Sequence, residues 1–491
     1  MEYQKTGSTV YLVSIVTAAV LGGLLFGYDT AVISGAEKGL QAFFVSAKDF
    51  IYTDSLHGIT SSSALIGCII GSGLSGMAAS RLGRKKSLIV ASILFLASAL
   101  GSYYPEFLLF KAGEPTMSLL VVFNLYRIIG GIGVGLASAI CPMYIAEMAP
   151  SHIRGKLVSW NQFAIIFGQL VVYFVNFVIL GEHENPIIKC INNVSQILNP
   201  ESSAWVISKG WRMMFVSEAV PAGLFLLMIS LVPETPRYLA MCGKDNQALR
   251  ILERINGTDK AKSILAEIKA CTTEKTERLF SYGWMVIFIG VMLSVFQQAV
   301  GINAVLYFAP RIFESMGMSN PMVQTVMMGC VNILFTLVAI FTVESLGRKP
   351  LLITGSIGMA LGAFGVSMSN WMTLPDIVPV ASIMIYSASF MISWGPICWV
   401  LISEIFPNTI RGAAVAIAVA FQWIFNFIVS ATFVPMYNLT LGDMGENFGH
   451  MFVYSLYGII CITAALFVWK LVPETKGKTL EDMTKLWKKN K

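Results

Sequence analysis

The chain has 491 residues, of which 55% are hydrophobic and only 13% are charged, and its net charge is +6. A soluble domain carries about a quarter charged residues, so this chain has too few polar groups to cover a surface in water. The composition excludes a disordered protein, a secreted disulfide scaffold and a coiled coil. It favours an all-α polytopic membrane protein, and the small net charge does not indicate nucleic-acid binding.

Twelve stretches are long and apolar enough to cross a bilayer, which takes about 20 helical residues. We predict spans near 11–34, 57–79, 87–104, 117–141, 157–180, 211–232, 282–309, 321–343, 351–369, 377–403, 412–435 and 449–471. They form an N-terminal half at 1–232 and a C-terminal half at 282–471. A linker at 233–281, expected to form short amphipathic surface helices, joins the halves, and a tail follows at 472–491.

Lys and Arg gather in alternate connections between the predicted spans. The connections after spans two, four, eight and ten carry them, as do the linker and the tail, whereas 435–448 has none. Positively charged connections stay in the cytoplasm, so we expect both termini and the linker to be cytoplasmic.

Short motifs occur once in each half. Leu-Gly-Arg-Lys stands at 82–85 and at 346–349, and Pro-Glu-Thr stands at 233–235 and at 473–475. Six helices repeated in the same orientation are typical of transporters that bind substrate between the halves, near the middle of the membrane. Within the spans, Gly395-Pro396 predicts a bend in span ten, and the glycines of span four (130, 131, 133 and 135) predict close helix packing.

The repeated motifs place four basic and four acidic residues at the expected cytoplasmic face. The set is Arg84, Glu147, Arg154, Glu234, Arg348, Glu404, Arg411 and Glu474. These residues either pair between the halves, as a gate that breaks when the inside opens, or form static ion pairs that brace each half. The sequence favours neither alternative.

Asp29 in the first span is the only acidic residue that we place at membrane depth in the first four spans, and Arg127 in the fourth is its basic counterpart. Burial disfavours the ionised form of a carboxyl group, and a nearby cation favours it. We therefore interpret the pair as a proton-binding site rather than a fixed salt bridge, because two buried charges are costly without a function. Glu218 and Arg212, in span six, are interpreted as structural.

Uncharged polar and aromatic residues recur inside five other spans. They are Gln162, Gln169, Gln297, Gln298, Asn303, Tyr307, Asn332, Trp394, Trp399, Gln422, Trp423 and Asn426. A single polar residue in a span more often forms a hydrogen bond between helices. Together, however, these residues supply the amides and aromatic faces that suit a neutral polyhydroxyl ligand such as a sugar. With four His and no CxxC or HExxH motif, the chain is not expected to bind a metal or another cofactor.

At these residues the chain resembles the sugar porter family of the major facilitator superfamily, and within it the bacterial proton-coupled xylose symporters. The segments that carry the resemblance are 22–35, 126–135, 142–147, 233–237, 296–303, 394–399 and 473–477. The resemblance implies twelve transmembrane helices in two six-helix repeats and a transporter rather than an enzyme.

The resemblance also implies roles for particular residues. Those that line the sugar site would be Gln162, Gln297, Gln298, Asn303, Trp399 and Gln422, with a wall completed by Phe26, Gln169, Tyr307, Asn332, Phe390 and Trp423. An acid at Asp29 implies proton coupling, with Arg127 as its partner. The implied protein is a monomer in the lipid bilayer of a bacterial inner membrane that imports a monosaccharide, D-xylose first and glucose as a further ligand.

Two positions depart from the family pattern. Phe308 stands where many relatives have a second Tyr, and Ala299-Val300 stands where glucose carriers have Leu-Ser, which makes xylose the better-supported substrate. Alternative hypotheses are a sugar uniporter, a symporter for another pentose or hexose, and a non-transporting sugar sensor. A membrane enzyme is not supported, because the chain shows no nucleophile–base pair.

Overall fold

The computed structural model describes the chain except for residues 1–7, 108–113, 151–152, 183–204, 273–278, 373, 408–409, 442–444, 446, 477–486 and 488–491. The described residues contain twelve helical segments that are long and apolar enough to cross a membrane, so the prediction of twelve spans is confirmed. Most of the tail predicted at 472–491 lies outside the described residues.

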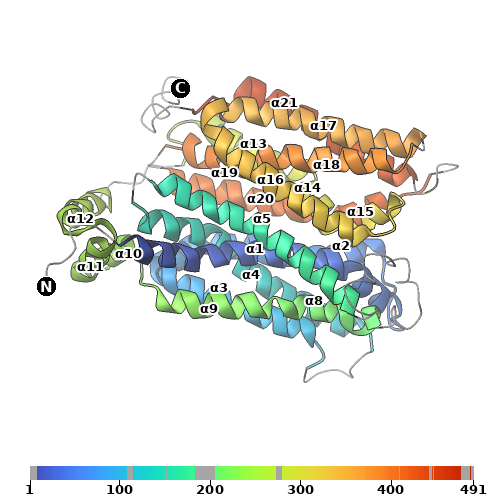
Figure 1. Ribbon diagram of the computed structural model, residues 1–491, viewed down its shortest axis with the longest axis horizontal. Helices are drawn as coiled ribbons and strands as arrows, with labels where there is room; N and C mark the ends of the chain where they lie inside the picture. Colours follow the sequence, from blue (N-terminus) through green and yellow to red (C-terminus); the bar gives the residue numbers. More distant parts are fainter. Residues whose placement is uncertain are drawn as a thin grey trace.

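Figure 1 shows the helices of the first half beside those of the second, with the linker helices at one end of both. The first half contains α1 (Thr9–Val45), α2 (Asp54–Arg81), α3 (Arg84–Tyr103), α4 (Met117–Met148), α5 (Arg154–Glu182) and a sixth span built of η3 (Val206–Gly210), α8 (Trp211–Ser217) and α9 (Ala219–Leu231). The linker forms α10 (Pro236–Met241), α11 (Asp245–Asn256) and α12 (Thr258–Thr272).

The second half contains α13 (Trp284–Ala299), α14 (Ile302–Tyr307), α15 (Ala309–Ser315), α16 (Pro321–Leu346), α17 (Arg348–Met372), α18 (Ile377–Ile392), α19 (Trp394–Ile405), α20 (Arg411–Tyr437) and α21 (Asn447–Leu471). We call the end of the bundle that carries α10–α12 the linker end, and the opposite end the far end. The backbone N–H of Ser8 donates to the carbonyl oxygen of Arg254 at 2.9 Å, which holds the start of α1 against α11 at the linker end.

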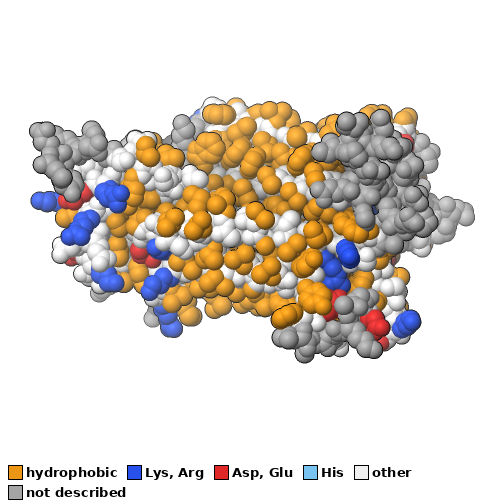
Figure 2. Space-filling view, turned by 60° about the horizontal axis from the view of Figure 1, so that its bottom comes forward, with side chains coloured by type: hydrophobic (Ala, Val, Ile, Leu, Met, Phe, Trp, Pro, Cys, Tyr) orange, Lys and Arg blue, Asp and Glu red, His pale blue; other side chains and the backbone are white. Residues whose placement is uncertain are grey.

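A band of apolar side chains covers the middle of the face in Figure 2, and charged side chains lie towards its two ends. Large apolar residues are exposed on many helices: Phe341 is 77% exposed and Leu361 is 68% exposed. A soluble protein would bury such side chains, so this surface fits the hydrocarbon core of a bilayer.

Glycine allows the helices of the first half to touch backbone to backbone. A Cβ on Gly131 of α4 would lie 1.8 Å from the carbonyl oxygen of Ala64 in α2, and one on Gly27 of α1 would lie 1.8 Å from that of Ile165 in α5. Both distances are far below van der Waals contact. The close packing predicted for span four is therefore confirmed, because only glycine fits there.

Two spans of the second half are interrupted. Gly301, with φ of 92°, separates α13 from α14, and Ser393 separates α18 from α19. The bend predicted in span ten is thus confirmed, with Gly395 and Pro396 in the first turn of α19, whereas the break at Gly301 was not predicted. Interrupted helices leave backbone carbonyls free to bond side chains or ligands.

Span one is longer than predicted. We expected it to end near residue 34, but α1 continues to Val45. Glu37 and Lys38 end the apolar run in the sequence, yet Glu37 is fully buried, because residues far along the chain pair with its carboxylate. Glu37 is thus a second buried acid of α1, and it lies beyond the end that we predicted for this span.

The glycine contact gives a matched test. Replacing Gly131 by Ala should destabilise the protein by roughly 1–3 kcal/mol, because α2 and α4 must separate to admit the methyl group. Replacing Gly73 by Ala in α2 should be neutral or slightly stabilising, since no atom lies within 4 Å of its Cβ position. Thermal unfolding of the two detergent-purified variants measures the difference, and equal midpoints would contradict the packing argument.

Candidate functional site

A cavity lies between the two halves. The first half contributes α1 and α5, and the second half contributes α14, α18 and the facing parts of α13, α19 and α20. Its lining residues are Phe26, Thr30, Gln162, Ile165, Ile166, Gln169, Gln297, Gln298, Asn303, Leu306, Tyr307, Phe390, Met391, Gly395, Trp399, Gln422, Trp423 and Asn426. Eleven of the twelve residues predicted for the sugar site thus surround one space.

The two helix breaks position the amides of the cavity. Gln297, near the end of α13, donates through Nε2 to the carbonyl oxygens of Trp394 (3.0 Å) and Gly395 (3.2 Å), which the break in span ten leaves free. Gln422 of α20 donates to Oε1 of Gln297. Beyond the other break, Asn303 donates to Oε1 of Gln298 at 2.5 Å. These bonds hold the amide groups in fixed orientations before any ligand arrives.

Several polar atoms at the cavity lack a hydrogen-bond partner in the described part of the chain. Oε1 of Gln169, Oε1 of Gln422 and Nε1 of Trp423 are buried and unpaired. Phe26 and Trp423 face each other from opposite halves, with ring centroids 5.4 Å apart. Two acceptors and one donor beside aromatic faces match the hydroxyl and C–H groups of a monosaccharide.

Asn332 is the predicted residue that does not line the cavity. It lies in α16, 1% exposed, and its Oδ1 accepts a hydrogen bond from Ser387 of α18 at 2.6 Å. Conversely, Thr30 lines the cavity without having been named, and Asn426, named among the polar residues but not among those implied for the sugar site, lines it as well. Their positions carried a signal: Thr30 follows Asp29, and Asn426 lies one helical turn after Gln422, on the same face of α20.

Asp29 and Arg127 form an ion pair inside the first half. Nη1 of Arg127 lies 2.6 Å from Oδ1 of Asp29, and both side chains are almost completely buried. Arg127 also donates to the backbone carbonyl oxygen of Asp29 at 3.2 Å, and its guanidinium lies 4.8 Å from the ring centroid of Phe215. The pair therefore joins α1 to α4 at the helix segment that carries Thr30 of the cavity.

Glu218, at the junction of α8 and α9, is a second buried acid in this region. Its side chain is fully buried within interaction range of Asp29 and Arg127. Neither of its carboxyl oxygens, nor Oδ2 of Asp29, has a hydrogen-bond partner among the described residues. A second carboxyl group thus lies near the Asp29–Arg127 pair, an arrangement that sequence reasoning missed because it treated Glu218 and Arg212 together as structural.

Arg212 instead pairs with Glu106. Its Nη1 lies 2.7 Å from Oε2 of Glu106, and the guanidinium lies 4.4 Å from the ring centroid of Trp211. This buried pair lies away from the Asp29 cluster and is satisfied within the first half.

The charged residues of the repeated motifs lie at the linker end. Arg84 pairs with Glu147 in the first half (2.8 Å), and Arg348 pairs with Glu404 in the second (3.0 Å). Arg411 donates to the backbone carbonyl oxygen of Phe406 at 3.1 Å, and Arg154 is exposed. Each of these two described ion pairs therefore joins helices of one half in this conformation, Arg84–Glu147 in the first half and Arg348–Glu404 in the second.

The repeated Pro-Glu-Thr motifs cap equivalent helices. Glu234 accepts hydrogen bonds from the backbone N–H groups of Arg84 and Lys85 at the start of α3, and Glu474 does the same for Arg348 and Lys349 at the start of α17. Burial raises the pKa of Glu234 above its ordinary value. Burial also acts on the less buried Glu474, but backbone N–H groups outweigh it and lower its pKa. The carboxylates neutralise the positive ends of the two helix dipoles.

Comparison with known proteins gives close relatives. The profile of the family described as "Sugar (and other) transporter" matches residues 15–487. The D-xylose-proton symporter of Escherichia coli (strain K12) is 49% identical, over 97% of this chain and 96% of the relative.

Two solved structures of the E. coli xylose transporter XylE share the fold. Its inward-open conformation superposes with a TM-score of 0.83 and 46% identity, covering 97% of this chain and all of that one. The XylE structure bound to 6-bromo-6-deoxy-D-glucose, described as a major facilitator superfamily protein, has a TM-score of 0.81 and 47% identity, over 98% and 99% of the two chains. The chain thus belongs to the sugar transporter family of the major facilitator superfamily.

Proposed function

We propose that this protein imports D-xylose together with a proton by alternating access. The observation that carries the proposal is the 49% identity, over nearly the whole chain, to a D-xylose-proton symporter. The cavity supports it independently, because its amides and aromatic rings come from both halves and suit an uncharged sugar. Glucose is a further candidate ligand, since XylE binds a glucose analogue.

The Asp29 cluster supplies a place for the proton. With both acids ionised, Asp29, Glu218 and Arg127 carry one net negative charge in a buried site, and one proton on a carboxyl group neutralises it. A proton on Asp29 also weakens the attraction between Asp29 and Arg127, and so between α1 and α4. Because Thr30 follows Asp29 on α1, a movement of this helix reaches the sugar cavity.

The orientation follows from the charge pattern. The linker end carries most of the Lys and Arg residues, so we assign it to the cytoplasm of a bacterial cell and the far end to the outside. Within the described residues, the ion pairs that join the two halves lie at the far end, and those of the linker end stay within one half. This distribution supports an inward-facing conformation, as does the similarity to inward-open XylE. We expect the protein to act as a monomer in the bilayer.

Replacing Asp29 by Asn should abolish xylose accumulation driven by a pH gradient and leave exchange of xylose between equal concentrations measurable. The amide cannot carry the transported proton, whereas the sugar cavity stays intact. Uptake into proteoliposomes, with and without a protonophore, measures both activities. The exposed Asp376→Asn variant is the control and should accumulate xylose normally. If the Asp29→Asn variant still accumulates xylose, and a protonophore abolishes that accumulation, the assignment of the proton site is wrong.

Replacing Gln422 by Ala should weaken xylose binding by roughly tenfold or more, because its unpaired Oε1 is available to a sugar hydroxyl and its Nε2 orients Gln297. Replacing Asn332 by Ala should leave affinity within about twofold, since this buried amide lies outside the cavity. Calorimetric titration of the folded, purified variants gives both dissociation constants. A larger loss for Asn332→Ala than for Gln422→Ala would show that the sugar binds elsewhere.

A further inference from the structure

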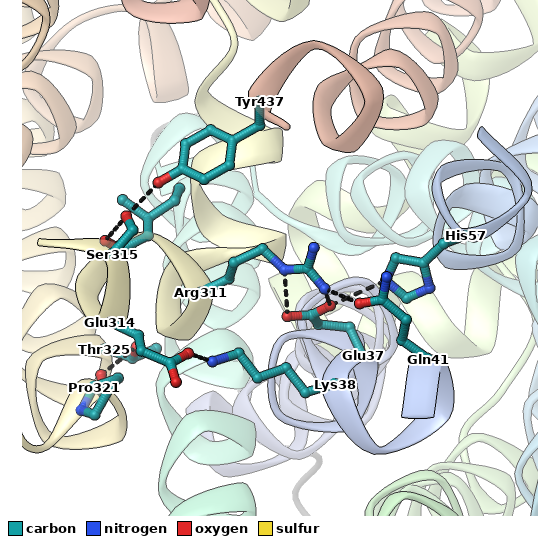
Figure 3. Close-up of polar contacts among 11 residues, drawn as sticks. Glu37, Lys38, Gln41, His57, Arg311, Glu314, Ser315, Pro321, Thr325 and Tyr437 are labelled. Carbon is teal, nitrogen blue, oxygen red and sulfur yellow. Dashed lines mark hydrogen bonds and ion pairs between the residues drawn. The ribbon is translucent and has the colours of Figure 1, made fainter. Parts of the chain in front are cut away.

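A buried ion pair joins the two halves at the far end of the bundle. Arg311 of α15 holds the carboxylate of Glu37 in α1 with two contacts, Nη2 to Oε2 at 2.7 Å and Nε to Oε1 at 3.1 Å (Figure 3). The Glu37 side chain is fully buried and Arg311 is 14% exposed. Arg311 also donates to Oε1 of Gln41, one turn further along α1.

His57 of α2 approaches the same carboxylate from the other side. Its Nε2 lies 3.0 Å from Oε2 of Glu37, and its Nδ1 lies 3.1 Å from the hydroxyl of Tyr52. If Tyr52 donates to Nδ1 and Nε2–H donates to Glu37, every one of these polar atoms has a partner and the imidazole is neutral. One carboxylate then balances one guanidinium, and His57 fixes the carboxylate in position for Arg311.

Other charged groups near the cluster form their own contacts. Lys38 of α1 pairs with Glu314 of α15, so a second ion pair joins the same two helices, but its side chains are 42% and 58% exposed. Asp54 accepts a hydrogen bond from Asn438 at 2.9 Å. An exposed pair contributes little to stability, whereas removing one partner of a buried pair is costly.

Aromatic and backbone contacts surround His57 on the side of the second half. Phe308 lies edge-on to the His57 ring, with centroids 6.5 Å apart, and stacks on Phe433 at 5.1 Å. A Cβ on Gly58 would lie 2.2 Å from the carbonyl oxygen of Ala431 in α20. The halves are therefore tightly packed at this level, which closes the far end of the bundle.

The position of the cluster relates it to the sugar pathway. Glu37 lies seven residues after Thr30 on α1, which places it about 10 Å from the cavity towards the far end. On its other side, a hollow open to the surface reaches Arg311 and is also lined by Lys38, Gln41 and His450. The cluster thus separates the sugar cavity from a hollow at the far end.

We propose that Glu37, His57 and Arg311 form an outer latch, which holds the extracellular side shut in the inward-facing state and must break before sugar reaches the cavity from outside. The proposal rests on the transport function proposed above. When the halves separate, water replaces the partners of Glu37 and Arg311, so the hydration of both charges offsets the lost ion pair and the latch is reversible. His57 acts as a positioning residue through Glu37.

Distances between spin labels at the far end test the latch without requiring transport. Labels at Ile51, in the α1–α2 connection, and at Ile377, at the start of α18, report on opposite halves and replace exposed side chains (85% and 69%). The labelled protein keeps the buried Cys68, Cys141, Cys398 and Cys461, and its other four cysteines are replaced by Ser. With the latch intact, we expect a single, short distance between the two labels. Arg311→Met should raise the ratio of a longer to the short distance by about tenfold or more, because Glu37 then gains water only by opening.

Lys38→Met is the matched control, since it removes the exposed ion pair between the same helices and should leave the distances unchanged. His57→Leu should shift the ratio in the same direction as Arg311→Met, and His57→Gln, whose amide supplies an N–H donor, should restore the short distance. If Arg311→Met does not fold, the near-isosteric Glu37→Gln should give the same shift. Distances unaffected by the latch variants, or shifted equally by Lys38→Met, would overturn the proposal.

Xylose binding to the same purified variants separates this proposal from the proposed function. A latch variant that opens and still binds xylose supports both. If a latch variant opens, but neither it nor the unmodified protein binds xylose, the result supports the latch and contradicts the proposed substrate.

Discussion

A charged side chain inside this helical bundle has no water to solvate it, so it needs an opposite charge or a hydrogen-bonding group from another helix. Asp29 and Arg127 meet this need between α1 and α4, and Glu106 and Arg212 meet it at the far end of the first half. With only 13% charged residues in the chain, each of these buried ion pairs therefore marks a contact between two particular segments of the bundle.

The location of these contacts divides the molecule into parts that move together and parts that separate. Arg84 with Glu147, and Arg348 with Glu404, join helices of the same half, as do backbone contacts such as that at Gly131. Such contacts favour two rigid halves. The buried pair of Glu37 in α1 and Arg311 in α15 connects different halves, so as the proposed latch it breaks and forms again in each transport cycle. Under the proposed function, a proton on the Asp29 cluster would act on α1, the helix that carries both the cavity residue Thr30 and Glu37.

The sequence predicted features that depend on one segment at a time. The twelve spans follow from apolar length, and the polar cavity residues stand out against the apolar background of their spans. Phe26 and Phe390, by contrast, were implied only by the family resemblance. Features that depend on distant partners were missed. In the sequence, Glu37 looks like the polar end of a span. In the structure it is buried, because Arg311, 274 residues away, pairs with it. Asn332 was assigned to the cavity, because the sequence does not show that α16 turns this amide towards Ser387 of α18.

The two departures from the family pattern, Phe308 and Ala299-Val300, were interpreted from the sequence as evidence about the substrate, but the structure places them outside the cavity. Phe308 and Val300 are fully buried and neither lines the cavity: Phe308 packs between His57 and Phe433, and the carbonyl oxygen of Val300 accepts a hydrogen bond from Tyr386. These residues therefore act on the closure of the far end and on the helix break that positions the amides. Under the proposed function, the choice between a pentose and a hexose would depend instead on side chains that line the cavity, such as Phe26, Gln169 and Trp423.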